Sequence, residues 1–225
     1  MLNYKKTKLM DKKDLYEFVL NYFEKTMPKP ETELKYKNPY ELIVAVMLSA
    51  QCTDVRVNKI TPEFFRHFPT PQSLAQAKSE QVYELIKTCS YPNNKTKYLI
   101  KMARMIIQEF KGQIPENFED LQKLPGIGRK SANVLAAIIH KQPRIAVDTH
   151  VFRVSNRIGL TDNSKTPLQT EKELIKYIPK EKRLKAHHWL ILHGRYTCTA
   201  RKPKCDKCGL KEICKYYNST KTNLK

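Results

Sequence analysis

The sequence has no apolar run long enough to cross a membrane. Its longest apolar run, Leu42–Leu48, falls well short of the roughly 20 residues that a membrane-spanning helix needs. The first segment, Met1–Lys13, is polar and basic, and no apolar segment of the kind found in a secretory signal follows it. These two absences exclude the membrane-embedded and secreted classes and favour a soluble intracellular protein.

Acidic residues are scarce relative to basic ones. Among the 225 residues, 22 Asp and Glu stand against 42 Lys and Arg, which gives a formal net charge of +20 at pH 7. A charge of this size, spread over most of the chain, indicates a polyanionic partner such as a nucleic acid. Much of the excess is lysine, so a genome biased towards A and T would raise the same number without a functional cause.

The alternation of apolar and polar residues that marks a half-buried strand is nearly absent, whereas helix signals recur. Asn38, Pro39 and Glu41 form an N-cap, a first-position proline and a capping-box glutamate. This start signal predicts that Leu42–Leu48, ambiguous by itself, is a buried helix at the centre of the core. The fold class is therefore predicted to be all-α.

Similar punctuation predicts the other helices, which begin at caps or prolines and end mostly at glycines or prolines. Their expected ranges are about 11–27, 54–67, 79–87, 95–111, 117–123, 129–140, 148–159 and 181–193, with further helices opened by Thr70-Pro71 and Thr166-Pro167. The end of the chain, 218–225, is a polar tail.

The stretch Leu124-Pro125-Gly126-Ile127-Gly128 joins two of these helices. Pro125 ends the first helix, and Gly126 and Gly128 permit a tight turn with φ > 0 and leave no side chain between the backbone and a ligand. The second helix then begins with unpaired N–H groups at the positive end of its dipole. Such a turn is suited to binding one phosphate of a nucleic acid backbone.

Lys130 follows Arg129 in the first turn of the second helix. The dipole disfavours an ammonium there and favours the neutral amine that a nucleophilic lysine needs. A Gly-x-Gly turn is weak evidence by itself, however, and most lysines of a lysine-rich chain are solvated surface residues. The turn alone leaves both interpretations of Lys130 open.

The six cysteines are unevenly placed. Four of them have the spacing Cys198-x6-Cys205-x2-Cys208-x5-Cys214, whereas Cys52 and Cys89 stand apart and are expected to be small buried apolar residues. In a reducing compartment, four clustered cysteines are typical of a metal site rather than of disulfides.

Two kinds of metal site fit four thiolates, namely a cubane iron–sulfur cluster and a tetrahedral zinc ion. Zinc sites usually take two separated Cys-x2-Cys pairs, and only Cys205 and Cys208 have that spacing, so iron–sulfur is favoured. The basic residues between the cysteines suggest that the loop binds phosphates. The simpler alternative is that the metal only folds the C-terminal segment.

Three features occur together: the turn Leu124–Lys130, the segment Val147-Asp148-Thr149-His150, and the four-cysteine loop. Together they resemble the endonuclease III family, the helix-hairpin-helix DNA glycosylases that carry a [4Fe-4S] cluster. The likeness runs from about residue 16 to 216 and includes Leu48–Asp54 and His187–Arg195.

The resemblance implies two helical domains with a DNA-binding cleft between them. A six-helix barrel domain would span about 32–142, with its helix-hairpin-helix at about 117–140. An iron–sulfur cluster domain would be discontinuous, built from 1–31 and 143–225, with the cluster loop at 198–214.

The resemblance also implies excision of oxidised pyrimidines from duplex DNA, followed by cleavage on the 3′ side of the abasic site. Lys130 would be the nucleophile, and Asp148 the carboxylate that assists deprotonation and stabilises positive charge on the sugar. Without the resemblance, Asp148 is better explained as an ordinary N-cap. The cofactor would be a [4Fe-4S] cluster held by Cys198, Cys205, Cys208 and Cys214.

Base removal requires the base to leave the helical stack, and the enzyme must then fill the gap. Gln51 matches the family's glutamine that enters the duplex. Tyr91, in the loop Cys89–Lys95, stands where the family usually has leucine, which puts the loop geometry and substrate range in doubt. Gly126, Gly128 and Arg129 would contact DNA.

The expected partner is double-stranded DNA containing damaged pyrimidines or abasic sites, bound by a monomer in a cytoplasm of the bacterial kind, at the nucleoid. Two alternatives remain: a monofunctional glycosylase of the same superfamily, which the presence of Lys130 argues against, and a non-catalytic, metal-stabilised DNA-binding module. Five of the six histidines have no paired spacing and are interpreted as core or phosphate-facing residues; they are His140, His150, His187, His188 and His193.

Overall fold

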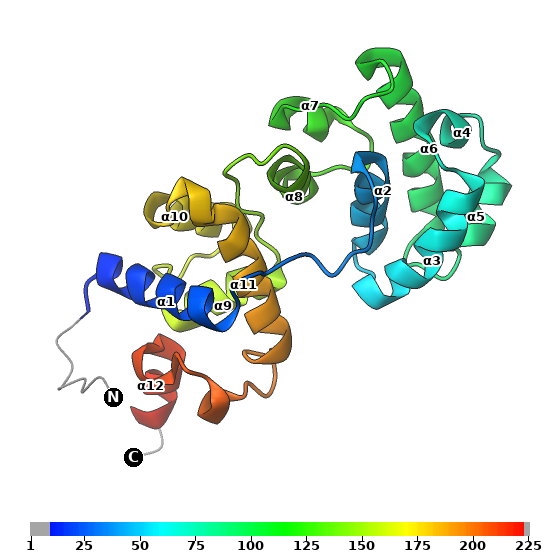
Figure 1. Cartoon of the computed structure of the whole chain (residues 1–225). Coiled ribbons are helices and arrows are strands. Elements are labelled where there is room, and N and C mark those ends of the chain that lie inside the picture. Colours follow the sequence, from blue (N-terminus) through cyan, green and yellow to red (C-terminus); the bar gives the residue numbers. More distant parts are fainter. Residues whose placement is uncertain (1–9, 223–225) are drawn as a thin grey trace. The chain divides into compact units, whose positions relative to one another are not determined.

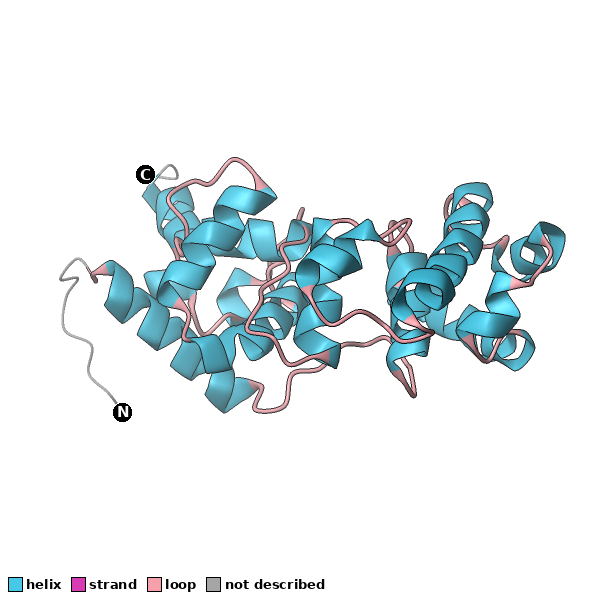
Figure 2. Ribbon diagram, turned by 90° about the horizontal axis from the view of Figure 1, so that it is seen from above, coloured by secondary structure: helices cyan, strands magenta, loops and turns pink. Residues whose placement is uncertain are grey.

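The computed structural model describes residues 10–222, and within this range every regular element is a helix (Figure 2). Residues 1–9 and 223–225, which include much of the basic start and the end of the polar tail, lie outside the described residues. The prediction of an all-α fold is confirmed. No helix of the described range is long and apolar enough to cross a membrane.

The chain divides into two compact units, each described by itself. One unit spans Thr32–Gln142, and the other joins the segment up to Glu31 to the chain from Pro143 onwards.

The unit 32–142 contains seven helices in its described residues (Figure 1). They are α2 (Pro39–Ser49), α3 (Asp54–His67), α4 (Pro71–Ala75), α5 (Ser79–Ile86), α6 (Pro92–Phe110), α7 (Phe118–Lys123) and α8 (Arg129–Ile139). Helix α2 is the centre of this core, because every side chain from Leu42 to Leu48 is at most 6% exposed. The predicted buried helix is therefore confirmed.

The start of α2 differs from the prediction in one detail. Asn38 caps the helix as expected, with its side chain accepting a bond from the Glu41 backbone N–H at 2.9 Å. The Glu41 carboxylate reaches one residue further back and accepts from the Lys37 N–H at 2.7 Å, instead of completing a capping box with Asn38.

The other unit contains α1 (Lys12–Thr26), α9 (Thr149–Ile158), α10 (Pro167–Tyr177), α11 (Arg183–Tyr196) and α12 (Lys215–Thr222), with 3₁₀ turns at Lys180–Lys182, Cys205–Lys207 and Lys211–Ile213. Helix α1 packs its buried face, which includes Tyr16 and Phe23, into a core shared with α9, α10 and α11. The Tyr16 hydroxyl donates to the Leu160 carbonyl at 2.7 Å, and the Trp189 indole donates to the Met27 carbonyl at 2.7 Å. These bonds join segments far apart in the sequence.

Gly194 does not end the last long helix, as the sequence had predicted; α11 runs through it to Tyr196. A Cβ atom at position 194 would lie 2.8 Å from the Cβ of His150 on α9. The glycine therefore permits two helices to pack closely, which the sequence pattern could not distinguish from a helix end.

Three further boundaries differ from the predictions. Lys78, not Ser79, is the N-cap of α5, and α6 begins at Pro92, earlier than the predicted Lys95. The segment 218–222, predicted as part of a polar tail, belongs to α12.

Candidate functional site

The turn between α7 and α8 is compact and is held to the core of its unit by two buried side chains. Leu124 is the C-cap of α7, and its carbonyl accepts a bond from the Ile127 N–H at 3.0 Å. Leu124 and Ile127 are 2% and 4% exposed, so both side chains fix the turn to the core.

The two glycines of this turn differ in backbone conformation and in the space around them. Gly126 has φ +82°, and a Cβ there would lie 3.0 Å from the Cβ of Tyr98 and 3.1 Å from the Cε of Met47. Gly128 has an extended backbone, with φ −87°, and a Cβ there would meet nothing within 4 Å. Of the two reasons for glycine given by the sequence, Gly126 provides the positive φ of the tight turn, and Gly128 leaves the helix start free of a side chain.

Helix α8 begins at Arg129 without a side-chain cap, because its N-cap residue is Gly128. The Arg129 guanidinium lies over the Phe118 ring, 5.3 Å from its centroid, and Lys130 is exposed in the first helical turn. The start of α8 therefore combines outward-pointing backbone N–H groups with two cationic side chains, a combination suited to an anion.

Asp148 is the N-cap of α9, in the other unit. Its Oδ1 accepts bonds from the backbone N–H groups of His150 and Val151, each at 2.8 Å. Within the described chain Oδ2 has no hydrogen-bond partner, and the side chain is half-buried. One carboxylate oxygen thus holds the helix start while the other can act on a ligand.

Gln51 and Tyr91 lie on two loops that the structure brings together. Both residues are exposed and adopt the left-handed conformation, with φ of 54° and 56°. The Ser90 hydroxyl donates to the Gln51 carbonyl at 2.6 Å. Non-glycine residues in this conformation are strained and often occur at functional sites.

Lys95 is buried in the unit 32–142 and forms hydrogen bonds to the backbone just before Gln51. Its side chain is 5% exposed, and its ammonium donates to the carbonyls of Leu48 at 2.7 Å and Ala50 at 2.8 Å. Burial lowers the pKa of Lys95. The sequence analysis missed this role, because the sequence gives no sign that a lysine 44 positions after Gln51 binds the end of α2.

Arg157 contacts two of the four C-terminal cysteines, Cys198 and Cys214. Its guanidinium contacts the Cys198 sulfur at 3.6 Å and the Thr199 carbonyl at 2.8 Å, and the Cys214 thiol donates to the Arg157 carbonyl at 3.2 Å. Arg157 also lies over the Tyr216 ring, 4.5 Å from its centroid. The sequence analysis did not identify Arg157.

The surroundings of these thiols act on their pKa values in two directions. Burial raises the pKa of Cys205, Cys208 and Cys214, and the other thiols of the group raise it further. The backbone N–H groups of Tyr216 and Tyr217, at the start of α12, act in the opposite direction on Cys214 and favour its thiolate. Among residues 10–222 no three His, Cys, Asp or Glu side chains converge on one metal-ion position. A four-iron cluster does not require such convergence, because each cysteine binds a different iron.

The cluster loop is held to the rest of its unit by close packing. A Cβ at Gly209 would lie 2.5 Å from the Tyr22 ring of α1, and the His193 ring nitrogen lies 3.7 Å from the Cys208 sulfur. The four basic side chains between Cys198 and Cys208 are exposed; they are Arg201, Lys202, Lys204 and Lys207.

The five histidines interpreted from the sequence divide into two groups. His187, His188 and His193 are at most 7% exposed, and burial lowers the pKa of His188 to about 3 and that of His193 to about 4. These three are core residues, as one of the two interpretations predicted. His140 and His150 are only partly buried.

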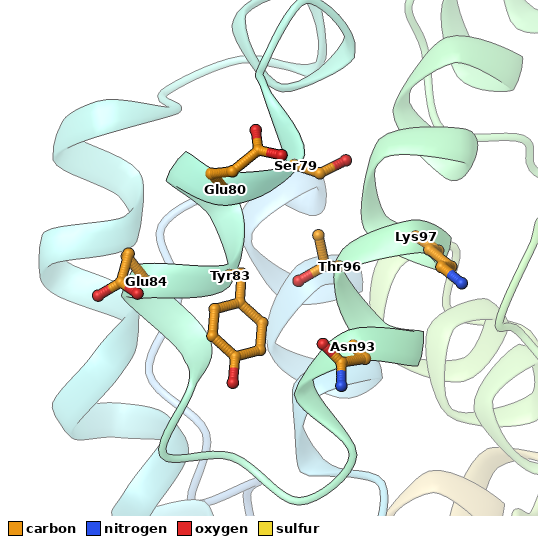
Figure 3. Close-up of a pocket in the computed structure, with 7 residues that line it drawn as sticks. All are labelled: Ser79, Glu80, Tyr83, Glu84, Asn93, Thr96 and Lys97. Atoms are coloured by element: carbon orange, nitrogen blue, oxygen red, sulfur yellow. The ribbon is translucent and has the colours of Figure 1, made fainter.

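A hollow of about 470 Å³ lies between α5 and α6 (Figure 3). Glu80, Tyr83 and Glu84 line it from α5, and Asn93, Thr96 and Lys97 line it from α6. The carboxylates of Glu80 and Glu84 disfavour a phosphate ligand, so the hollow is not a candidate site for a nucleic acid backbone.

Two protein-family models match the chain. The model described as "HhH-GPD superfamily base excision DNA repair protein" matches residues 44–180. The model described as "Iron-sulfur binding domain of endonuclease III" matches residues 198–214, the range of the four cysteines.

Curated proteins and solved structures agree with these matches. Endonuclease III of Rickettsia prowazekii is 46% identical over 90% of this chain and 95% of its own length, and endonuclease III of Escherichia coli K12 is 43% identical over 88% and 93%. A trapped endonuclease III–DNA covalent intermediate superposes with a TM-score of 0.89 at 39% identity, covering 93% of this chain and 98% of that one. A non-covalent endonuclease III–DNA complex matches with the same TM-score at 38% identity and the same coverage.

Proposed function

The chain belongs to the endonuclease III family of base excision DNA repair proteins, and we propose that it removes oxidised pyrimidines from duplex DNA and then cleaves the abasic site. It is a bifunctional DNA glycosylase and abasic-site lyase that carries a [4Fe-4S] cluster. The preference for oxidised pyrimidines and the residue roles below are our proposals.

Lys130 is the nucleophile in this proposal, and one observation carries it: the side chain is exposed in the first turn of the uncapped helix α8. There its amine lies beside N–H groups suited to a DNA phosphate. The amine attacks C1′ of the damaged nucleotide, the base leaves, and a Schiff base forms. Loss of a 2′ proton then breaks the C3′–O bond by β-elimination. A covalent endonuclease III–DNA intermediate has been trapped in a relative, which supports a covalent route.

Asp148 is the carboxylate of the reaction. Its Oδ1 is used in capping α9, whereas Oδ2 is available to assist deprotonation and to stabilise positive charge on the sugar. The capping bonds hold the carboxylate in place, so the structural and catalytic roles are compatible.

Gln51 and Tyr91 fill the gap left by the extruded nucleotide. Their loops are joined by the Ser90–Gln51 bond, and both side chains are exposed. The Tyr91 ring, 61% exposed, can stack on a base where a leucine would only fill space. Gly126, Gly128 and Arg129 bind the adjacent backbone phosphate.

Cys198, Cys205, Cys208 and Cys214 hold the [4Fe-4S] cluster. When bound, the cluster crosslinks the loop and brings no open coordination position to the substrate. The chain's own contribution is the display of Arg201, Lys202, Lys204 and Lys207, which are exposed and bind DNA phosphates. We further propose that the protein acts as a monomer at the nucleoid of a bacterial cytoplasm.

The test is borohydride trapping on a duplex with one abasic site. The wild type is expected to form a covalent protein–DNA adduct, and Lys130→Ala is expected to form none while retaining the cluster's visible absorbance. Lys101→Ala removes an exposed lysine from α6 and serves as the matched control, with an unchanged adduct yield.

Other outcomes separate the alternatives. An adduct that survives in Lys130→Ala assigns the amine elsewhere. Base release without any adduct indicates a monofunctional glycosylase, and salt-dependent binding without product indicates a binding module.

A further inference from the structure

Cys52 and Cys89, which stand apart in the sequence, lie together in the structure. Their sulfur atoms are 3.8 Å apart, across 37 residues of chain. Cys52 immediately follows Gln51, and Cys89 comes two positions before Tyr91. The thiol pair therefore bridges the same two loops as the Ser90–Gln51 bond.

The two thiols differ in accessibility. Cys52 is partly exposed, whereas Cys89 is 4% exposed. Burial and the neighbouring Cys52 raise the pKa of Cys89 to about 11, although the nearby Lys95 charge lowers it. A solution oxidant thus reaches Cys52 first, and Cys89 is protected from direct attack.

We propose that Cys52 and Cys89 are a redox modification site, at which a low-molecular-weight disulfide forms a reversible intrachain disulfide that weakens binding of the damaged duplex. The effect on DNA rests on the proposed function of Gln51 and Tyr91, whereas formation of the bond does not.

The chemistry requires two exchanges. The Cys52 thiolate attacks one sulfur of the small disulfide and releases one small thiol. Cys89 then loses its proton to the departing group and attacks the Cys52 sulfur, which releases the second small thiol. Overall, two protein thiols are oxidised and one small disulfide is reduced to two thiols. A reducing thiol reverses both steps.

The disulfide changes the loops because its bond is shorter than the contact it replaces. A disulfide holds the sulfurs about 2.05 Å apart, so closure from 3.8 Å shortens the distance between the two sulfurs by roughly 1.8 Å, which the two side chains and their loops must accommodate together. Gln51 and Tyr91 lie one and two residues from the bridge, in strained backbone conformations held by the Ser90 and Lys95 bonds. Their spacing in the reduced protein is therefore lost on oxidation.

The test treats the cluster-loaded full chain with oxidised glutathione. Tryptic peptides 38–56 and 88–95, which contain Cys52 and Cys89 and none of the other four cysteines, are expected to appear as one linked species that lacks two hydrogens. Binding of an abasic duplex is expected to weaken about ten-fold and to recover after dithiothreitol. Visible absorbance checks that the cluster survives the treatment.

Cys52→Ser and Cys89→Ala are the matched variants. Cys52→Ser is expected to bind DNA equally well before and after oxidation, whereas Cys89→Ala is expected to keep one glutathione on Cys52 and to yield no linked peptide. Absence of the linked peptide overturns the proposal, as does a linked peptide with unchanged DNA binding in a protein whose reduced form is active. A linked peptide in a protein that shows no glycosylase or lyase activity when reduced would instead overturn the proposed function.

Discussion

The Ser90 hydroxyl donates a 2.6 Å hydrogen bond to the backbone carbonyl of Gln51, across 39 residues of chain. This bond joins two exposed loop residues, Gln51 and Tyr91, that both adopt left-handed conformations. Because each conformation is strained, contacts such as this one are needed to keep the pair in place.

Ser90→Ala is expected to weaken binding of a duplex with an abasic site about five-fold, the equivalent of one net hydrogen bond of about 1 kcal/mol. The melting temperature is expected to change little, because the released carbonyl lies at an exposed loop and can bond to water. Ser219→Ala removes a comparable hydroxyl-to-carbonyl bond, on α12, and serves as the control. Equal weakening in both variants would contradict a specific role for Ser90.

Alanine at Gly126 is expected to lower mainly the stability of the protein, and alanine at Gly128 mainly its affinity for DNA. Gly126→Ala places a side chain at φ +82° and 3.0 Å from Tyr98, which is expected to destabilise the protein by about 1–3 kcal/mol. Gly128→Ala meets no atom within 4 Å and is expected to cost at most about 1 kcal/mol of stability, because alanine is a poorer N-cap than glycine. It is expected to weaken DNA binding, because its methyl group crowds the phosphate. Thermal unfolding and fluorescence anisotropy measure the two effects. Unchanged DNA binding by Gly128→Ala would show that this turn does not bind a DNA phosphate.

Asp148→Asn is expected to retain the cap of α9, since asparagine caps helices as well as aspartate. It is expected to lower the single-turnover rate of base release by about 10²-fold or more, because the charge is lost. Asp148→Ala is expected to lose a further ~1 kcal/mol of stability with the cap. A fully active Asp148→Asn would show that the carboxylate serves only as a cap.

Loss of one cluster cysteine is expected to remove the visible absorbance and the bound iron. Cys205→Ala is expected to lose both and to bind DNA more weakly, with a smaller salt dependence, because the basic loop is no longer held. Cys52→Ala is expected to retain full iron content and serves as the control. Full iron in Cys205→Ala would exclude Cys205 as a ligand.

Acid is expected to destabilise the protein partly through His188. Burial lowers its pKa from 6.5 to about 3, so below pH 6.5 the unfolded chain takes up a proton that the folded chain does not. Stability is therefore complete above that pH and decreases as the pH falls, by about 1.4 kcal/mol per pH unit. His188→Phe is expected to reduce this pH dependence of the unfolding free energy, measured by chemical unfolding at several pH values. His67→Gln changes an exposed histidine and is expected to leave the pH dependence unchanged.

Local signals predicted most of the fold. Helix starts at Asp11, Asn38, Asn117 and Thr166 were correct because a side chain caps its own neighbouring backbone, an interaction that the sequence contains in full. Gly194 was misinterpreted because its reason lies in another helix, against His150.

The candidate site divides in the same way. The turn at Gly126 and the spacing of the four cysteines are local, so the sequence alone was enough to propose an anion site and a metal site there. Lys95, Ser90 and Arg157 act on residues far away in the chain, and their roles became visible only when the fold brought those residues together. The contact between Cys52 and Cys89 belongs to the same class.

The packing of α1 has a consequence for synthesis. Tyr16 and Phe23 face a core whose other members, among them Val151, Ile158 and Trp189, come from the chain after Pro143. A ribosome therefore releases α1 well before its native partners exist, and the whole unit 32–142 emerges in between. During that interval the apolar face of α1 remains open to chaperones or to non-native contacts, so the first described helix to be made is among the last to be buried.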